Sequence, residues 1–218
     1  MSLNLERARF NMIEQQVRPW DVLDARVLAV LGQVQREHYV SEAHRQLAFA
    51  DLELPLAHGE FMMKPVVEGR VLQALDVQPG DSVLEIGTGS GFLTACLARL
   101  GRDVVSVEQH ADLAATARER LQRDGITNAK VEVAEAVREF QPGREFDAIV
   151  LTGAVCTLPE RFAAWLRPGG RLFAVIGESP AQQAIVFTRD GTHLREISLF
   201  ETDLAYLTNA APPKRFSL

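Results

Sequence analysis

The stretch V-L-E-I-G-T-G-S-G-F, residues 83–92, decides the fold. Its first residues belong to a short β-rich run, and we expect a strand over residues 82–86. Three glycines follow at alternate positions, and an apolar helix is predicted over residues 92–100. Glycines between a strand and a helix let the backbone turn tightly and approach a ligand closely. In open α/β sheets, ligands bind at such turns, beyond the carboxyl ends of the strands.

Strands and helices alternate downstream of this loop. Strands are predicted over residues 103–107, 130–133, 146–151 and 171–176, and helices over residues 111–123 and 158–166. This alternation predicts right-handed βαβ units, and therefore an α/β, Rossmann-like, mostly parallel sheet with helices on both faces. Two further β-rich runs, residues 184–188 and 193–200, flank Asp190-Gly191 and predict a C-terminal antiparallel hairpin at the sheet edge.

The part before the loop differs and predicts a helical N-terminal extension. Residues 22–31 have helical apolar spacing after Asp21, the expected N-cap, and a short helix over residues 41–48 is expected to be capped by Ser41. Residues 54–65 lose this periodicity and are predicted as a loop, because two prolines and a glycine interrupt them. A helix over residues 65–75 follows. We therefore divide the chain into an extension with its loop, residues 1–64, and a Rossmann-like domain, residues 65–218.

The spacing of the glycines and two acids indicates the ligand. A dinucleotide site reads G-x-G-x-x-G, whereas here the third glycine comes one residue early and the bulky Phe92 follows. S-adenosylmethionine has no pyrophosphate and tolerates that bulk, and Glu85 suits its ammonium and sulfonium charges. Glu108 ends the second strand, where an acid can accept hydrogen bonds from the hydroxyls of an adenosine ribose. The predicted S-adenosylmethionine site therefore consists of Glu85, Gly87, Thr88, Gly89, Ser90, Gly91 and Glu108.

Composition excludes several other classes of function. The net charge is −6 and no dense Lys/Arg cluster occurs, which disfavours a nucleic-acid partner. Cys96 and Cys156 stand far apart and form no C-x-x-C pattern, so neither a metal site nor a disulfide framework is expected. No apolar run approaches the ~20 residues that span a bilayer. Residues 1–9 lack the apolar core of a signal peptide. We therefore expect a cytoplasmic protein with no membrane partner; no pattern indicates its oligomeric state.

The surroundings of residues 83–92 resemble class I S-adenosylmethionine-dependent methyltransferases, and more narrowly the protein-L-isoaspartate O-methyltransferase family. The stretch is similar to that family's V-L-E-I-G-T-G-S-G-Y, and the similarity covers about residues 36–178. It includes Leu54-Pro55-Leu56, Ser106-Val107-Glu108, residues 146–150, Thr152 and Gly169-Gly170. The resemblance implies methyl transfer to an isoaspartyl carboxylate in a protein or peptide substrate, with S-adenosylhomocysteine as the product. It also adds Thr152 and Glu135 to the expected cofactor-binding residues.

Two departures from the family pattern bear on the site. The family's loop reads approximately Q-T-I-S-Q-P, whereas residues 60–65 read E-F-M-M-K-P. Phe61 and Met63 thus replace a threonine and a serine whose hydroxyls contribute to the family's active site. The family's G-D-G after the third strand, whose acid helps to hold the adenine, reads Ala134-Glu135-Ala136, so Glu135 keeps an acceptor on a longer arm.

The catalytic residues are not determined by the sequence, but the loop offers three candidates. His58 would act as a base or polar contact, Lys64 would pair with a substrate carboxylate, and Met63 would line the acceptor site. His58 and Lys64 also have an interpretation as ordinary loop residues. Three functions stay open at this point. They are an isoaspartyl methyltransferase, a methyltransferase with a less polar acceptor facing an apolar wall at residues 61–63, and a non-catalytic module that binds S-adenosylmethionine or S-adenosylhomocysteine.

Overall fold

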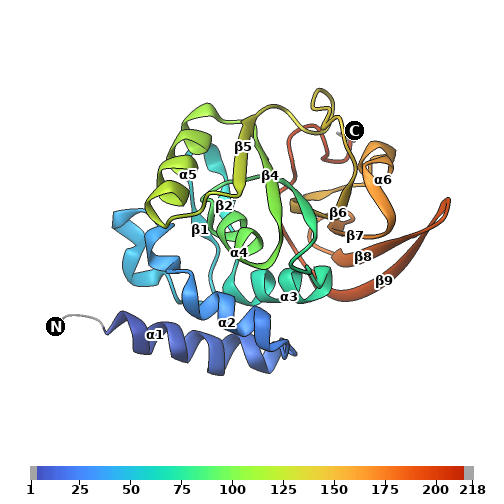
Figure 1. Ribbon diagram of the computed structural model, residues 1–218. Helices are drawn as coiled ribbons and strands as arrows, with labels where there is room; N and C mark the ends of the chain where they lie inside the picture. Colours follow the sequence, from blue (N-terminus) through green and yellow to red (C-terminus); the bar gives the residue numbers. More distant parts are fainter. Residues whose placement is uncertain (1–3, 214–218) are drawn as a thin grey trace, which may run out of the picture.

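The strands predicted around the glycine loop lie at the centre of a seven-stranded sheet. The computed structural model describes residues 4–213 (Figure 1). The order of the strands across the sheet is β5-β4-β3-β6-β7-β8-β9. Their bounds are β3 Ser82–Ile86, β4 Asp103–Glu108, β5 Ala129–Val133, β6 Phe146–Val155, β7 Leu166–Ile176, β8 Gln182–Asp190 and β9 His193–Thr202.

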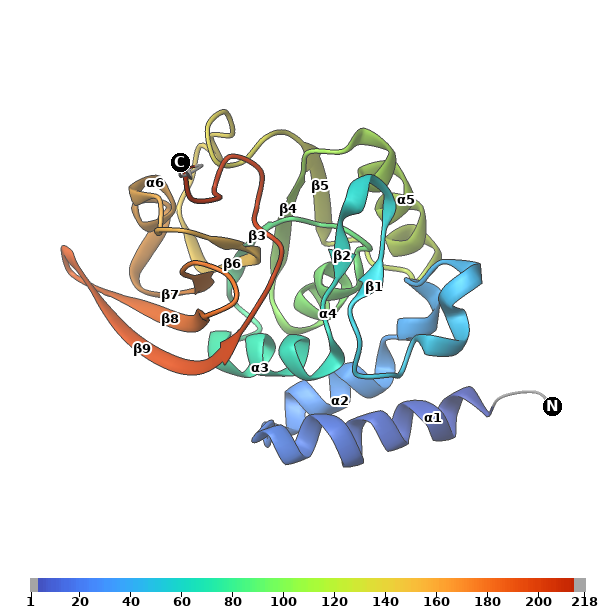
Figure 2. The same ribbon diagram turned by 180° about the vertical axis from the view of Figure 1, so that it is seen from behind.

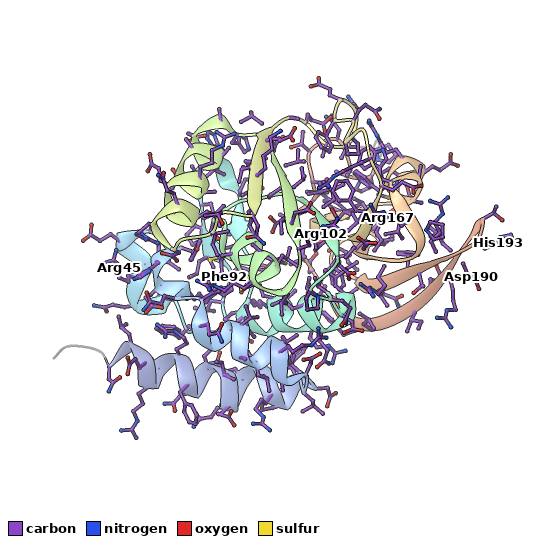
Figure 3. The ribbon with its side chains drawn as sticks, viewed as in Figure 1. Arg45, Phe92, Arg102, Arg167, Asp190 and His193 are labelled. Atoms are coloured by element: carbon purple, nitrogen blue, oxygen red, sulfur yellow. The ribbon has the colours of Figure 1, made fainter. Side chains whose placement is uncertain are left out.

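The first five of these strands are parallel and the last two are antiparallel, so the predicted fold class is confirmed. After β3 the chain builds the sheet outward through β4 and β5, and it then returns to pair β6 with the other side of β3. The glycine loop therefore leaves the sheet at its topological switch point, where open α/β sheets bind ligands. Asp190 and His193 lie at the far tip of the β8–β9 hairpin (Figure 3).

The helices that connect the strands are α3 Pro65–Leu75, α4 Phe92–Leu100, α5 Ala111–Arg123 and α6 Glu160–Ala164. The predicted bounds of the first three helices are confirmed. The last prediction was wrong in extent: α6 has only five residues, and β7 begins at Leu166 rather than at residue 171. Leu166 pairs with Phe146 before the register shifts, so Pro168-Gly169-Gly170 lies in an irregular part of the strand.

Successive side chains of the central strands point to opposite faces of the sheet, and each face packs against its own apolar core. Val83 and Val150 face a core shared with the N-terminal helices, α3 and α4, whereas Leu84 and Leu151 face a second core that contains Phe162 of α6. Both β3 and β6 are buried on both faces, as central strands of a parallel sheet are, and β6 accordingly contains the apolar run of residues 148–151.

The N-terminal extension is helical, as predicted, but its boundaries differ from the prediction. Its segments are α1 Leu5–Met12, a π-helical turn Ile13–Val17, short 3₁₀ turns at Arg18–Trp20, Arg36–His38 and Glu42–Leu47, and α2 Ala25–Gln33. Asp24, not Asp21, caps α2: its carboxylate accepts from the backbone of Arg26, whereas Asp21 has φ 59° and ends the preceding turn. Ser41 occupies the predicted N-cap position of the turn at Glu42–Leu47, but its hydroxyl pairs with the ring of His44 and makes no capping hydrogen bond.

Residues 54–65 were predicted as a plain loop, and this was incomplete. Two short strands, β1 Leu54–Pro55 and β2 Phe61–Met62, pair antiparallel around a 3₁₀ turn at Ala57–Gly59. Figure 2 shows this hairpin in front of the sheet, with the C-terminal segment that follows β9 also crossing in front. The division of the chain after residue 64 stays a prediction. The core that Val83 and Val150 face contains residues from both sides of this division. Within residues 4–213, no helix combines the length and apolar character that a membrane crossing needs.

Candidate active site

The glycine loop is held open by its backbone conformation and by a neighbouring strand. Gly87, Gly89 and Gly91 have φ values of 97°, 50° and 86°, which L side chains rarely adopt. A Cβ at Gly87 would lie 2.2 Å from Oγ1 of Thr152, and that hydroxyl donates to the Gly87 carbonyl at 2.7 Å. The loop therefore presents bare backbone, and Thr152 fixes its first turn from β6.

Glu85 lies beneath this loop and is fully buried. Its Oε2 accepts hydrogen bonds from Thr94 and, at 2.5 Å, from Ser106, while its Oε1 has no partner among residues 4–213. Burial raises the pKa of Glu85 to about 8, and the two hydroxyl donors only partly oppose that rise. A buried carboxyl group with one unpartnered oxygen fits a ligand that brings positive charge.

Glu108 stands at the end of β4, as predicted, and faces the glycine loop. Its Oε2 accepts from the backbone N–H of Gly89 at 2.8 Å and its Oε1 from that of His110 at 3.0 Å. Each carboxylate oxygen can accept a second hydrogen bond. The structure thus holds the carboxylate in place and leaves an acceptor position on each oxygen for the hydroxyls of a ribose.

Glu135 follows β5 and is fixed in the same manner. Its two oxygens accept from the backbone N–H groups of Val137 and Arg138, both at 2.8 Å. The longer arm, compared with the family's aspartate, therefore reaches forward to cap the turn that follows. Glu135 nevertheless borders the same cleft as Glu108.

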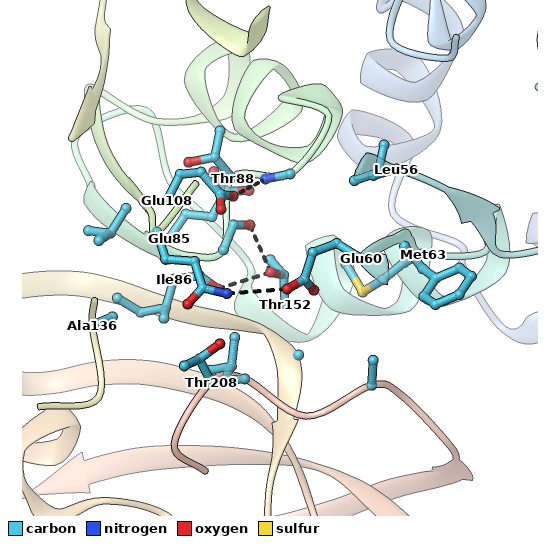
Figure 4. A pocket seen from close by; sticks show the side chains of 18 of the residues that line it. Leu56, Glu60, Met63, Glu85, Ile86, Thr88, Glu108, Ala136, Thr152 and Thr208 are labelled. Carbon is cyan, nitrogen blue, oxygen red and sulfur yellow. Dashed lines mark hydrogen bonds between the residues drawn. The ribbon is translucent and has the colours of Figure 1, made fainter. Parts of the chain in front are cut away.

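One cleft brings these groups together with the loop of residues 54–65 (Figure 4). Its volume is about 970 Å³, counting the space that opens to solvent. One end is formed by the glycine loop, Glu108 and Glu135; the other end includes Glu60, Phe61, Met62 and Met63. In Figure 4, Glu85, Thr88 and Glu108 lie to one side of Thr152, and Glu60 and Met63 lie to the other.

A buried ion pair holds the apolar end of the cleft. Arg36 is 0% exposed and pairs with Glu68, which is 2% exposed and also lines the cleft. The same guanidinium donates to the carbonyl of Met63 at 2.7 Å and lies 4.9 Å from the ring centre of Phe92. Burial raises the pKa of Glu68, against the attraction of Arg36. Residue 63 is thus anchored through its backbone while its side chain faces the cleft.

The structure does not bring every candidate into the cleft. Met63, Thr88, Ser90 and Thr152 line it, but within the described chain His58 and Lys64 do not. The exposed His58 bonds Asp112 at 2.9 Å and stacks on His110 with ring centres 4.1 Å apart. Phe92 was expected to matter through its bulk beside the ligand, but its side chain is buried in the core (Figure 3), so that argument against a dinucleotide does not hold.

Sequence reasoning missed the wall supplied by the C-terminal segment. Residues 204–208 line the cleft, and Leu207 and Ala205 exchange backbone hydrogen bonds with Ala154 at the end of β6. A Cβ at Gly153 would lie 2.9 Å from Leu207, so that glycine permits the close approach. Glu53 and Glu60 were also missed, since the loop offered no periodicity to show which way they face. Among residues 4–213, no group of three His, Cys, Asp or Glu is placed to hold a metal ion.

Comparison with known proteins decides the family. Residues 8–209 match the family model described as Protein-L-isoaspartate(D-aspartate) O-methyltransferase (PCMT). The protein-L-isoaspartate O-methyltransferase of Magnetococcus marinus is 40% identical over 186 residues, which cover 85% of this chain and 81% of the relative. That of Methanoculleus marisnigri is 35% identical over 193 residues, 88% of each chain. This chain belongs to the PCMT family. It is an S-adenosylmethionine-dependent methyltransferase of the protein-L-isoaspartate type.

Solved structures agree on the fold. A Plasmodium falciparum beta-aspartate methyltransferase (PCMT), crystallised with S-adenosyl-L-homocysteine, superposes with a TM-score of 0.78 over 95% of this chain and 99% of its own. A second protein-L-isoaspartate O-methyltransferase gives 0.81 over 93% of this chain and 67% of its own. Both are less than 25% identical, so they confirm the fold alone. The family match confirms the predicted family and cofactor, and the solved structures confirm the predicted fold class.

Proposed function

We propose that this chain methylates a carboxylate of a protein or peptide segment that enters the cleft beside residues 60–63 and 204–208. The observation that carries the proposal is that a single cleft joins those residues to the glycine loop and Glu108. A methyl donor at one end and an acceptor at the other would share one enclosed space, which is the condition for direct transfer.

The cofactor-binding roles follow from the groups that the cleft offers. We assign the ribose hydroxyls to Glu108, the adenine side to Glu135 and the positively charged methionine portion to the surroundings of Glu85. The unpartnered oxygen of Glu85, the bare glycine backbone and the free acceptor positions of Glu108 fit S-adenosylmethionine. When bound, this cofactor supplies a methyl group on a sulfonium that needs no further activation.

The residues of the chain then have to orient the acceptor. A carboxylate has an ordinary pKa of about 4, so it is ionised at neutral pH and attacks without a general base. Alignment of the nucleophile, the methyl carbon and the sulfur is what remains, and a misplacement of about 1 Å costs ~100-fold in rate. The side chains at residues 61–63 cannot donate hydrogen bonds, so orientation relies on backbone groups, on other polar side chains of the lining such as Thr208, and on the fit of the apolar wall.

The apolar wall also favours a second candidate, a methyl acceptor less polar than an isoaspartyl carboxylate. Phe61 is 49% exposed beside the cleft, and Met62 and Met63 are buried against it. Methionine side chains adapt to irregular apolar partners. An enzyme with this wall would bind an isoaspartyl carboxylate loosely. Its preferred acceptor would have to be identified with substrates other than isoaspartyl peptides.

The test compares wild type with the double variant Phe61→Thr, Met63→Ser on one isoaspartyl peptide, using labelled S-adenosylmethionine. Restoring both hydroxyls is expected to raise kcat/KM by about tenfold or more, because a hydrogen-bonded carboxylate is held in line. Wild-type turnover equal to that of hydroxyl-bearing relatives would defeat the second candidate. Labelling of a cell extract by wild type, without turnover of the peptide, would support it. A cytoplasmic location and the division after residue 64 remain predictions.

A further inference from the structure

The lining of the cleft has an unusual balance of charge. Among the described residues that line it there is no lysine, arginine or histidine, whereas six glutamates do so. These are Glu53, Glu60, Glu68, Glu85, Glu108 and Glu135. Arg36 balances the charge of Glu68, and the raised pKa of Glu85 keeps that group largely protonated at neutral pH, so the negative charge comes from the other four glutamates. One positively charged cofactor offsets only part of it. An anionic acceptor therefore enters a cleft whose potential opposes it.

Most of these carboxylates already have partners. Backbone N–H groups hold Glu108 and Glu135, hydroxyls hold Glu85, Arg36 holds Glu68, and the side chains of Gln109 and His110 lie 3.2 and 3.3 Å from Glu60. Glu85 still carries a fully buried oxygen with no partner among residues 4–213. The buried end of the cleft therefore also favours positive charge, independently of the groups at its mouth.

Glu53 differs from the other five. In the described part of the chain it makes no hydrogen bond and no ion pair, and it is half-buried. Burial and the nearby Asp203 raise the pKa of Glu53, and Lys64 opposes that rise without lining the cleft. Its carboxylate is thus free to take a cationic partner from outside the chain.

The position of Glu53 places it at the acceptor end. Leu54 pairs with Met62 in the β1–β2 hairpin, and continuing that register by one residue places Glu53 opposite Met63. Both residues line the cleft. A segment whose acceptor group reaches Met63 must therefore carry its neighbouring residues past Glu53.

We propose that Glu53 is a specificity-determining residue, selecting acceptor segments that carry a lysine or arginine next to the methylated residue. The inference rests on the proposed function, since it assumes that the acceptor enters beside Met63. A basic neighbour pairs with Glu53 and offsets the negative potential that the acceptor carboxylate meets. An acidic neighbour is repelled by Glu53 and Glu60 together. Attraction of the basic neighbour and repulsion of the acidic one therefore both favour the basic segment.

The experiment uses isoaspartyl peptides that differ at one flanking position, which is lysine, alanine or glutamate. For wild type, kcat/KM is expected to be about tenfold higher for the lysine peptide than for the glutamate peptide, and this ratio should shrink in high salt. Glu53→Gln should reduce the ratio to about threefold or less, and Glu53→Lys should invert it. The control Glu119→Gln removes the same charge from an exposed position on α5, outside the cleft lining, and should keep the wild-type ratio. A Glu53→Gln enzyme with an unchanged ratio overturns the proposal.

A binding measurement separates failure of this inference from failure of the proposed function. Fluorescently labelled lysine- and glutamate-flanked peptides are titrated with wild type and Glu53→Gln in the presence of S-adenosylhomocysteine. If no peptide is methylated but wild type still binds the lysine peptide more tightly and Glu53→Gln does not, the carboxylate acceptor is wrong and the selectivity of Glu53 stands. Equal dissociation constants for both peptides with wild type overturn the selectivity itself.

Discussion

Replacing Glu85 by glutamine should change how the stability of the enzyme depends on pH. Glu85 is fully buried, and burial raises its pKa to about 8, from an ordinary value of 4.5 in an unfolded chain. Groups facing it from neighbouring elements are Thr94 and Cys96 of α4, Ser106 and Glu108 of β4, and Glu68 of α3, whose partner is Arg36. No cation contacts Glu85 among residues 4–213, so nothing restores its ionised form in the ligand-free enzyme.

Proton linkage gives the sign and the size of the contribution that Glu85 makes to the free energy of unfolding. Between pH 4.5 and pH 8 the unfolded chain has lost the Glu85 proton while the folded chain keeps it, so the free energy of unfolding falls as pH rises. The slope from this one group is about 1.4 kcal/mol per pH unit, and it ends near pH 8. The Glu85→Gln variant has no proton to release in this window and lacks this part of the slope.

Urea unfolding of ligand-free wild type and Glu85→Gln at pH 5.5, 6.5, 7.5 and 8.5 measures the difference. The stability of the variant relative to wild type is expected to grow by several kcal/mol across this range, with Glu119→Gln running parallel to wild type. Parallel profiles for wild type and Glu85→Gln would mean that Glu85 ionises normally in the folded protein. The carboxylate would then already be charged in the ligand-free cleft, and the claim that burial keeps Glu85 protonated would be wrong.

Two further variants test the cofactor end and the buried pair. Glu108→Ala should weaken S-adenosylmethionine binding by about 1.5–3 kcal/mol in calorimetry, because a charged acceptor is lost; unchanged affinity would remove Glu108 from the ribose site. Glu68→Ala should lower the free energy of unfolding by about 3–5 kcal/mol, because Arg36 is left buried without its partner. Joint replacement by Arg36→Met and Glu68→Leu should recover much of that loss in urea unfolding, and no recovery would contradict the explanation.

The helices and strands whose residues show a clear apolar period could be predicted from the sequence. The helices α3, α4 and α5 and the parallel strands β3, β4 and β6 follow from apolar periodicity and from the glycines at 87, 89 and 91. The prediction failed at Asp21, because Asp24 also offered a cap and propensity alone did not choose between them. At Ser41 the predicted position was right, but the hydroxyl pairs with His44 instead of the backbone. It also missed the β1–β2 hairpin, whose two-residue strands are too short to show a period.

The sequence by itself determined the fold class, the glycine loop, Glu108 at the end of β4 and the loss of the hydroxyls at residues 61 and 63. Each of these depends on residue type at a local spacing. Only the tertiary structure decided that Glu53 and the C-terminal segment line the cleft, that His58 and Lys64 do not, and that the Phe92 side chain is buried in the core. These facts depend on contacts between segments up to about 150 residues apart, and no local pattern encodes which side of a loop faces a cleft.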